Sequence, residues 1–451
     1  MKTSHQHLKN AFRYFCAAAL LCYPVSSMAQ RDTAQNSFNL QMEFVTHGEA
    51  CGGGLPKADP GSYVESKSDF LFGRTRITAE YARPGLEARA VLQNKAVWGS
   101  SGNQAVNLYE GWVKLKAKNG LFAQIGRIAL SYDDERIIGT NDFATAALSH
   151  DALRLGYEGH GHQLHVILAY NQNADSVYTN TYYTDGAEDY KTMQTVWYHY
   201  DVPKFPLGAS LLFMNIGMQA GVPGSASNPP TTKYQQMYGG YLNFHPEFLT
   251  LEGSYYRQSG KIVNTKMEFK PIKAWMASVK ATIKPAKKYE FELGYDYLSG
   301  DDYVPVIHGG MMGLPLLAVE GGFTPLYGSR SKFYGILDYY YESAYINGFT
   351  PGLQNTFAGV HFIPNDRLTV RAVYHYLATA TQLHGLDRTL GHSVELQAHY
   401  DFTKDISLDA GYTQMVGTET MDRLRQGNTN KYARWAWFTL AVKPSLFTKK
   451  W

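Results

Sequence analysis

Basic side chains recur at alternate positions between residues 74 and 154 of this 451-residue chain. They are Arg74, Arg76, Arg89, Lys95, Lys114, Lys116 and Arg154. A guanidinium group pairs with a carboxylate through two parallel hydrogen bonds, and a series of modest sites can pass a polyanion along without trapping it. The acids Glu80, Glu87 and Glu110 are interleaved among these cations. The pattern therefore fits either a path for an anionic substrate or a structural ladder of opposite charges.

A second charged set, between residues 280 and 409, is mixed in sign. Its basic members are Lys280, Arg367, Arg371 and His375, and its acids are Glu290, Glu292, Asp296, Glu395 and Asp409. If both sets face one interior, we expect one wall to be net basic and the other to be mixed or acidic.

Other chemistries have weaker support. His160, His162 and His165 have the spacing of metal ligands but lack a Cys or acid partner. The acid runs 133–135 and 301–302 could bind calcium or bridge lipopolysaccharide through divalent ions, but we interpret them as solvated loop acids. No G-x-S-x-G motif occurs, and the glycine run 52–54 lacks the lysine and helix of a phosphate loop. We therefore expect no catalytic residue, no metal and no cofactor.

The stretch from Ser68 to Trp98 shows which elements must position the basic residues. On each side of the break 82–85, which holds Pro84 and Gly85, polar and apolar residues alternate. This period of two is typical of strands with one apolar face. The pattern recurs along the chain, and no long apolar run supplies a core. The alternatives are a large soluble all-β sandwich or propeller, and a transmembrane β-barrel whose apolar faces contact lipid.

The N-terminus predicts export from the cytoplasm. Residues 1–29 read as a signal peptide, with Lys2, Lys9 and Arg13 before an apolar segment 15–25 and small residues before a cleavage site at Gln30. Residues 30–451 would then form a single barrel domain.

The composition of the mature chain excludes some classes. It would hold 451 − 29 = 422 residues and one cysteine, Cys51, so no internal disulfide can form. Its 42 − 3 = 39 basic residues balance 39 acids, which gives no support to nucleic-acid binding. No stretch of about 20 apolar residues follows the signal, so we expect no transmembrane helix. The 34 Tyr and 42 Gly suit the strands and aromatic girdles of a barrel.

Strict alternation of short turns and long loops sets the strand count. The expected strands are 37–45, two within 68–98, 107–117, 121–128, 151–158, 163–171, 193–201, 209–217, 234–245, 250–256, 272–283, 289–298, 355–362, 367–377, 393–402, 406–415 and 435–443. The strand-like run 332–341 would break the alternation, so we place it inside one long outer loop, 299–353. This predicts eighteen antiparallel strands with both termini in the periplasm. The aromatic end, Trp451, is similar to the signal that outer-membrane barrels present to their assembly machinery.

Two regions carry a family resemblance. Gly126-Arg127, Tyr132 to Gly139, Asp142-Phe143 and Asp151 to Leu155 resemble the core of the alginate-export outer-membrane family. Tyr297 to Asp302, Phe323 to Gly328, Lys332 to Gly335, Asp338-Tyr339 and the closing Trp437 to Pro444 resemble its second half. The resemblance implies an eighteen-stranded channel for an anionic polysaccharide, narrowed by inserted loops and lined with Arg and Lys. Arg127 and Arg136 match the motif and join the candidate pore-lining residues.

The sequence leaves three hypotheses about the function of the protein. The first is an outer-membrane channel for acidic sugars or their polymer, lined by Arg74, Arg76, Arg89, Lys95, Lys114, Arg127, Arg136 and Arg154. The second is a general diffusion porin, and the third is an outer-membrane barrel enzyme. Inward folding of loop 299–353 would favour the selective channel. The expected partners are membrane lipid and lipopolysaccharide, the barrel assembly machinery and an anionic glycan, but not nucleic acid. Docking of a periplasmic partner is left open.

Overall fold

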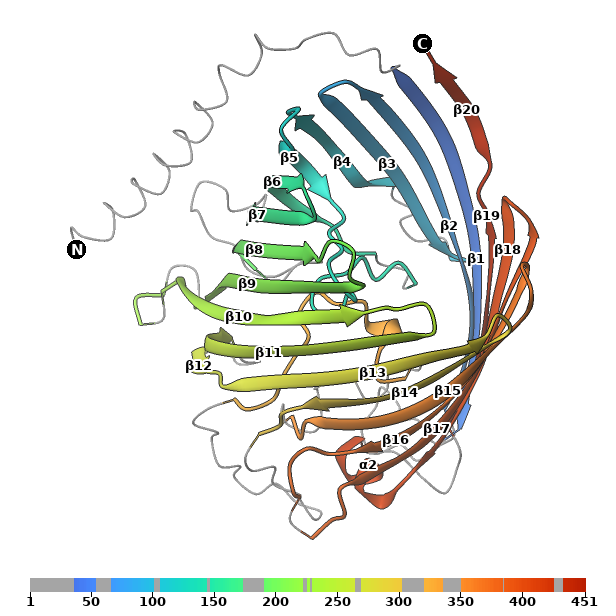
Figure 1. Ribbon diagram of the computed structural model, residues 1–451. Coiled ribbons are helices and arrows are strands. Elements are labelled where there is room, and N and C mark those ends of the chain that lie inside the picture. Colours follow the sequence, from blue (N-terminus) through green and yellow to red (C-terminus); the bar gives the residue numbers. More distant parts are fainter. Residues whose placement is uncertain are drawn as a thin grey trace.

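The protein is a closed antiparallel β-barrel of eighteen strands (Figure 1). The computed structural model describes residues 36–53, 66–100, 106–143, 147–172, 190–221, 225–227, 229–263, 269–301, 320–335, 350–383, 385–425 and 433–451. The predicted signal peptide lies outside these residues. Within the described part of the chain, no helix is long and apolar enough to cross a membrane.

The strands are long and follow one another around the barrel. They are β1 (Ser37–Gly53), β2 (Ser66–Arg83), β3 (Leu86–Val97), β4 (Val106–Lys116), β5 (Leu121–Ile128), β6 (His150–Gly159), β7 (His162–Tyr170), β8 (Thr192–Asp201), β9 (Leu207–Ala220), β10 (Thr231–Phe244), β11 (Leu249–Val263), β13 (Ala274–Ala286), β14 (Tyr289–Leu298), β15 (Leu353–Asn365), β16 (Leu368–Ala378), β17 (Thr389–Thr403), β18 (Ile406–Gly417) and β19 (Ala433–Val442).

Four shorter elements complete the fold. β12 (Phe269–Pro271) pairs with the end of β11, and β20 (Ser445–Lys450) continues the closing strand after Pro444. The helices are η3 (Arg330–Lys332) and α2 (Glu419–Arg425).

The barrel closes where the first and last strands meet. β1 pairs with β2 along one side and with β19 and then β20 along the other. Phe44 lies opposite Val442, and Ser37 lies opposite Lys450. The predicted count of eighteen strands is therefore confirmed.

Side-chain alternation in the strands is inside out relative to a soluble protein. On β14 the Leu293 side chain is 61% exposed, whereas its neighbour Glu292 is only 7% exposed. On β2 and β3, Ile77 and Leu92 are likewise exposed, while Arg74 and Gln93 are buried. The apolar faces point outward and the polar faces point into the barrel, which is the arrangement of a barrel that spans a membrane.

The two ends of the barrel differ as the sequence predicts. At one end, hereafter the turn end, tight turns use Gly85, Gly120 and Gly161 with positive φ. A Cβ at Gly120 would lie 2.4 Å from the carbonyl oxygen of Glu158, so this turn requires glycine. At the other end, the loop end, β1 and β11 extend beyond the predicted strands, to Gly53 and Val263. Residues 332–335 form no strand, and 336–341 lie outside the described residues.

Two long connections fold into the barrel and pair with each other. We call residues 129–143 and 320–335 the inner loop pair. The amide of Gly139 donates to the Tyr327 carbonyl at 2.7 Å, and the Tyr327 amide donates to the Ile137 carbonyl at 3.0 Å. Ile138 and Tyr327 thereby form an isolated parallel bridge. Inward folding, which we expected for loop 299–353, is seen for residues 320–335, and residues 302–319 and 336–349 of this loop lie outside the described residues.

The inner loop pair brings an apolar core that the sequence analysis did not expect. Inward-facing residues of the strands and buried residues of the loops form one cluster inside the barrel. Its fully buried members include Ile128, Leu130, Ile138, Met193, Met214, Met237 and Met276. The barrel interior is therefore partly filled by packed side chains of the inner loop pair and of strands from β5 to β19.

Candidate functional site

Arg74 and Arg76 lie side by side on the inner face of β2. Arg74 lies 2.9 Å from Glu43 on β1 and 3.2 Å from Asp142 on the inner loop pair. Arg76 lies 2.7 Å from the same Asp142 carboxylate and covers the Tyr109 ring at 4.1 Å. The two guanidinium groups therefore attach a loop to the barrel wall, and both are buried.

Two lysines add charge to this group. Lys95 on β3 is the cross-strand partner of Arg74, and it makes no ion pair with any residue that the structure describes. Lys443 lies 3.3 Å from Glu43. Four cations thus surround the two carboxylates of Glu43 and Asp142, which leaves the group positive. We call it the Arg74 group.

Lys114 and Arg154 form a second cationic pair, nearer the turn end. The Lys114 ammonium lies 3.8 Å from the centre of the Phe122 ring and 3.6 Å from Glu158. Arg154 donates to the Tyr132 hydroxyl at 3.4 Å and to the side-chain carbonyl of Gln124. Lys114 therefore shares the exposed Glu158 carboxylate with His165, and Arg154 makes no ion pair with a residue that the structure describes.

Around Arg89, carboxylates outnumber cations. It is paired with both Glu80 and Glu110, and Glu110 also accepts a hydrogen bond from the Trp112 indole at 2.9 Å. Lys116 is paired with Glu87 on the neighbouring strand. These contacts are the ladder of opposite charges that the sequence left as an alternative.

Arg127 does not line the pore, so the prediction for this residue is corrected. It lies on the same face of β5 as Leu121 and Ile125, whose side chains are exposed on the outside of the barrel. Its guanidinium lies 2.6 Å from Asp151 on β6 and donates to the Leu108 carbonyl at 3.2 Å. The motif match did not show which side of the barrel wall Arg127 faces, because that depends on the alternation of side chains along β5.

Arg136 lies deep inside the barrel rather than along an open wall. It lies 3.2 Å from Asp134 and 3.1 Å from Asp296, and it donates to the Tyr334 hydroxyl at 2.9 Å and to Ser278 at 3.0 Å. Burial disfavours its charge, but Tyr334, Asp296 and Asp134 outweigh burial and hold the pKa of Arg136 well above its ordinary value. Arg136 thus joins both inner loops to the far wall. We call these contacts the Arg136 site.

The run Asp133-Asp134-Glu135 is not a set of solvated loop acids, which corrects that interpretation. Asp133 accepts from Ser210 at 2.5 Å and from the Trp197 indole at 3.1 Å. Burial raises the pKa of the Asp133 carboxyl despite these bonds. The backbones of Asp133 and Glu135 have positive φ, 53° and 66°. Such strained residues persist where surrounding contacts fix them.

Glu135 ties the two loops together. It lies 2.5 Å from Lys332 and accepts from Ser131 at 2.6 Å and from Ser329 at 2.7 Å. Asp301, another predicted loop acid, is buried and accepts amide hydrogens of Gly321 and Thr350, each at 2.7 Å. The acid runs therefore position the inner loop pair.

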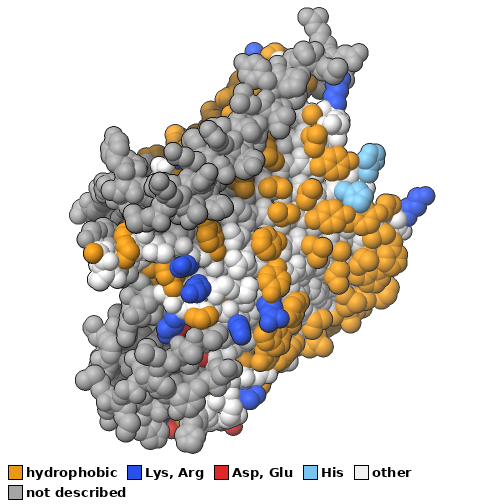
Figure 2. Space-filling view, turned by 90° about the vertical axis from the view of Figure 1, so that its left-hand side faces the viewer, with side chains coloured by type: hydrophobic (Ala, Val, Ile, Leu, Met, Phe, Trp, Pro, Cys, Tyr) orange, Lys and Arg blue, Asp and Glu red, His pale blue; other side chains and the backbone are white. Residues whose placement is uncertain are grey.

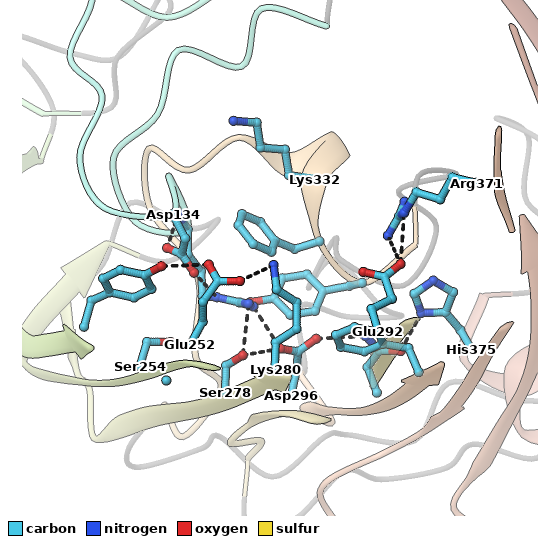
Figure 3. A pocket seen from close by; sticks show the side chains of 17 residues that line it. Asp134, Glu252, Ser254, Ser278, Lys280, Glu292, Asp296, Lys332, Arg371 and His375 are labelled. Atoms are coloured by element: carbon cyan, nitrogen blue, oxygen red, sulfur yellow. Dashed lines mark hydrogen bonds and ion pairs between the residues drawn. The ribbon is translucent and has the colours of Figure 1, made fainter. Parts of the chain in front are cut away.

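The far wall forms a cavity that the Arg136 site borders (Figure 3). Lys280 lies 2.5 Å from Glu252, and Arg371 lies 2.8 Å from Glu292. The His375 ring bonds to Asn355 at 2.9 Å. Each of these cations has an acid partner, so this wall is mixed in charge, as the sequence predicts.

The histidines 160, 162 and 165 do not converge. His162 stacks on Tyr200 at 4.3 Å, whereas His165 faces inward and contacts the Tyr132 hydroxyl at 3.0 Å. Within the described ranges, no three His, Cys, Asp or Glu side chains are placed to hold a metal ion.

Sequence reasoning missed several members of these groups. Glu43 and Glu252 are acids on inner faces, and alternation in their strands could have placed them. Tyr109 faces inward beside Glu110 because the β3–β4 register shifts between Val91 and Leu92. Asp142 and Tyr334 contact the barrel wall from loops, and loops have no regular alternation of side chains from which these contacts could be predicted.

Comparisons with known proteins agree with this architecture. The family model described as alginate export matches residues 92–389. A search by sequence finds no curated protein that matches the chain. Among solved structures, OccK5 (OpdH) of Pseudomonas aeruginosa is 11% identical, with a TM-score of 0.58 over 91% of this chain and 99% of that one. OccAB1 of Acinetobacter baumannii is 10% identical, with a TM-score of 0.58 over 90% and 97%.

A third similar structure was solved with a ligand. OccK2 (OpdF) of Pseudomonas aeruginosa in complex with glucuronate is 11% identical, with a TM-score of 0.57 over 91% of this chain and 98% of that one. At these identities the likeness concerns the fold. With the family match, it identifies the barrel as an integral protein of a Gram-negative outer membrane. The turn end is then periplasmic and the loop end extracellular.

Proposed function

Because this chain belongs to the alginate export family and forms an outer-membrane channel, we propose that it passes an anionic polysaccharide or a uronate-type oligosaccharide. The observation that carries the proposal is the excess of cations in two groups on one wall. The Arg74 group holds four cations and two carboxylates, and in the Lys114–Arg154 pair only Lys114 is paired with a described carboxylate, that of Glu158.

The two groups lie at different depths. Lys114 is three residues before the turn that begins at Ala117, whereas Lys95 is ten residues beyond Gly85. At about 3.3 Å per strand residue, this places the groups roughly 20 Å apart along the strands. Modest sites at such a spacing bind a polyanion at several points without trapping it. OccK2, a structural neighbour, was solved with the uronate glucuronate, which supports a sugar acid as the substrate class.

The paired cations serve a different purpose in this proposal. Arg89, Lys280 and Arg371 are held by acids, so substrate carboxylates would have to compete for them. We assign these residues to wall rigidity, and we assign substrate contact first to Lys95, Lys114 and Arg154. The dense pairing elsewhere is also what a general diffusion porin would use, which keeps that function as the second candidate.

Current block by uronate oligomers distinguishes the two. Purified protein in a planar bilayer would be titrated with oligouronate and, as a neutral control, with a maltooligosaccharide of equal length. We expect the uronate alone to block, and Lys95→Gln/Arg154→Gln to weaken block by about tenfold or more. Arg127→Gln on the outer face is the matched charge control and should block like wild type. Equal block by both sugars, or none, would favour the general porin.

A further inference from the structure

Three cations lie on the outside of the barrel at the extracellular end, away from the transport path. Arg257 and Lys261 are exposed on β11, and Lys273 is exposed just before β13. Gln258 pairs with Ala274 and Lys261 with Pro271, so the shared register sets Lys273 opposite Ser259. Lys273 therefore falls between the two β11 cations, on the adjacent strand. We call these three residues the rim cations.

The rim cations make no ion pair with any residue that the structure describes. Glu320, whose carbonyl accepts the Lys273 amide at 2.9 Å, is instead paired with Lys270 at 3.1 Å. Arg257 and Lys261 are four residues apart, or about 13 Å. Among the described residues, three charges without an ion-pair partner thus lie on a patch two strands wide.

The surface around the rim cations is arranged in bands: Arg257 is the cross-strand partner of Trp275, and Lys261 and Lys273 lie nearer the extracellular end. Tyr255, Trp275 and Tyr297 form a row across β11, β13 and β14, with ring centres 6.1 Å and 4.6 Å apart. Further toward the periplasm, Val279 and Leu293 are exposed. Basic side chains gather on this side of the barrel, beside its hydrophobic surface (Figure 2). Aromatic rows mark the membrane–water interface, so the rim cations lie at the height of the outer-leaflet headgroups.

A contrast comes from the outer face of β5 and β6. There Arg127 also lies near the extracellular end, but Asp151 neutralises it at 2.6 Å. The rim cations differ from Arg127 in that no described carboxylate neutralises them. The patch combines positive charge above with an apolar surface below, which matches an amphiphile that has anionic groups on its head and acyl chains beneath.

We propose that the rim cations, with the aromatic row, bind the phosphate groups of lipopolysaccharide in the outer leaflet. Each ammonium or guanidinium within a few ångströms of the headgroup plane would pair with a phosphate oxygen, and the Tyr255–Trp275–Tyr297 row would contact the top of the acyl chains. This inference does not depend on what the lumen transports.

The test is retention of lipopolysaccharide by purified full-length protein in detergent. Wild type would be titrated with fluorescent lipopolysaccharide and with the same glycolipid after enzymatic dephosphorylation, with EDTA present to remove divalent bridges. The variant is Arg257→Gln/Lys261→Gln/Lys273→Gln. The matched control neutralises three exposed lysines of the periplasmic turns, Lys287→Gln/Lys288→Gln/Lys404→Gln. Heat-modifiable gel mobility would show that each variant is folded.

We expect the rim variant to lose affinity for lipopolysaccharide by about tenfold to a hundredfold, with the control unchanged. Wild type should bind the dephosphorylated glycolipid as weakly as the rim variant binds the intact one. Equal loss in both triple variants would mean nonspecific charge attraction and would overturn the proposal. So would unchanged binding by the rim variant, or displacement of the lipid by soluble oligouronate, because the rim would then be a contact for the emerging substrate.

Discussion

Replacing Arg136 with methionine should release the inner loop pair from the far wall. Methionine retains much of the length of the side chain but neither the charge nor the five donors. The change leaves Asp296, which is buried, and Asp134 without their cation, and Tyr334 and Ser278 each lose a hydrogen bond. Breaking a buried ion pair by removing one partner costs about 3–5 kcal/mol. The lower figure alone would raise the ratio of released to attached loops by more than about a hundredfold.

Single-channel recording would detect that shift. In the wild type we expect the attached state to dominate, with low conductance and few transitions. Arg136→Met should give larger or more frequent open events. Arg136→Met/Asp296→Asn should recover part of the wild-type behaviour, because the double variant no longer leaves a buried charge unpaired at Asp296. Arg136→Lys, which keeps charge but loses the fork, should lie between.

A role of Arg136 in loop attachment is refuted if Arg136→Met, shown to be folded by its gel mobility, conducts and gates like wild type. It is also refuted if the double variant is worse than the single variant, since the cost would then not come from the unpaired carboxylate of Asp296. Either result would mean that other contacts, such as the Ile138–Tyr327 bridge, hold the loops alone.

Two further predictions concern pH and the lipid face. Burial opposes ionisation of Glu135, but hydrogen bonds from Lys332, Ser131 and Ser329 outweigh it and hold its pKa below the ordinary 4.5. Because the folded-state pKa is the lower one, the contribution of Glu135 to loop attachment is complete above pH 4.5 and is lost as pH falls through the folded value. We therefore expect open events in bilayers to increase as pH is lowered below 4.5, and this part of the response to vanish in Glu135→Gln; a response unchanged in that variant would exclude Glu135 as its source. Leu293→Arg places a charge on the lipid face and should lower the unfolding free energy by about 2–4 kcal/mol in urea titrations in lipid vesicles. An unchanged midpoint would contradict the outward assignment of Leu293.

The barrel could be predicted from the sequence because its strands and turns are specified by local residue patterns. Alternation along a strand assigns each side chain to a face, and short turns such as that at Gly120 alternate with long loops, which gives the strand count and polarity. Leu121–Ile128 and Tyr289–Leu298 match the expected strands at both ends. Strand ends at the extracellular side were underestimated, because the ladder of β1 and β11 continues beyond the membrane-spanning pattern.

The interior was harder to predict, because it depends on contacts between distant segments. Sequence periodicity does not predict that Asp142 contacts Arg74. Nor does it predict that Tyr334 contacts Arg136, which lies 198 residues away along the chain. The apolar core inside the barrel had no signal of its own, since its methionines belong to strands that already had an apolar outer face. Whether Arg127 faces the lumen or the outside depends on its position in the alternation of β5, and a family motif gives no information about that alternation.

The most direct test of the central claim is the reversal potential of the channel in a planar bilayer under a salt gradient. The excess of cations in the Arg74 group and at Lys114 and Arg154 predicts anion selectivity. Lys95→Glu/Arg154→Glu should reduce or reverse that potential, whereas Arg127→Glu should leave it unchanged. A cation-selective or unselective wild-type channel would contradict the claim that a net positive wall lines the path.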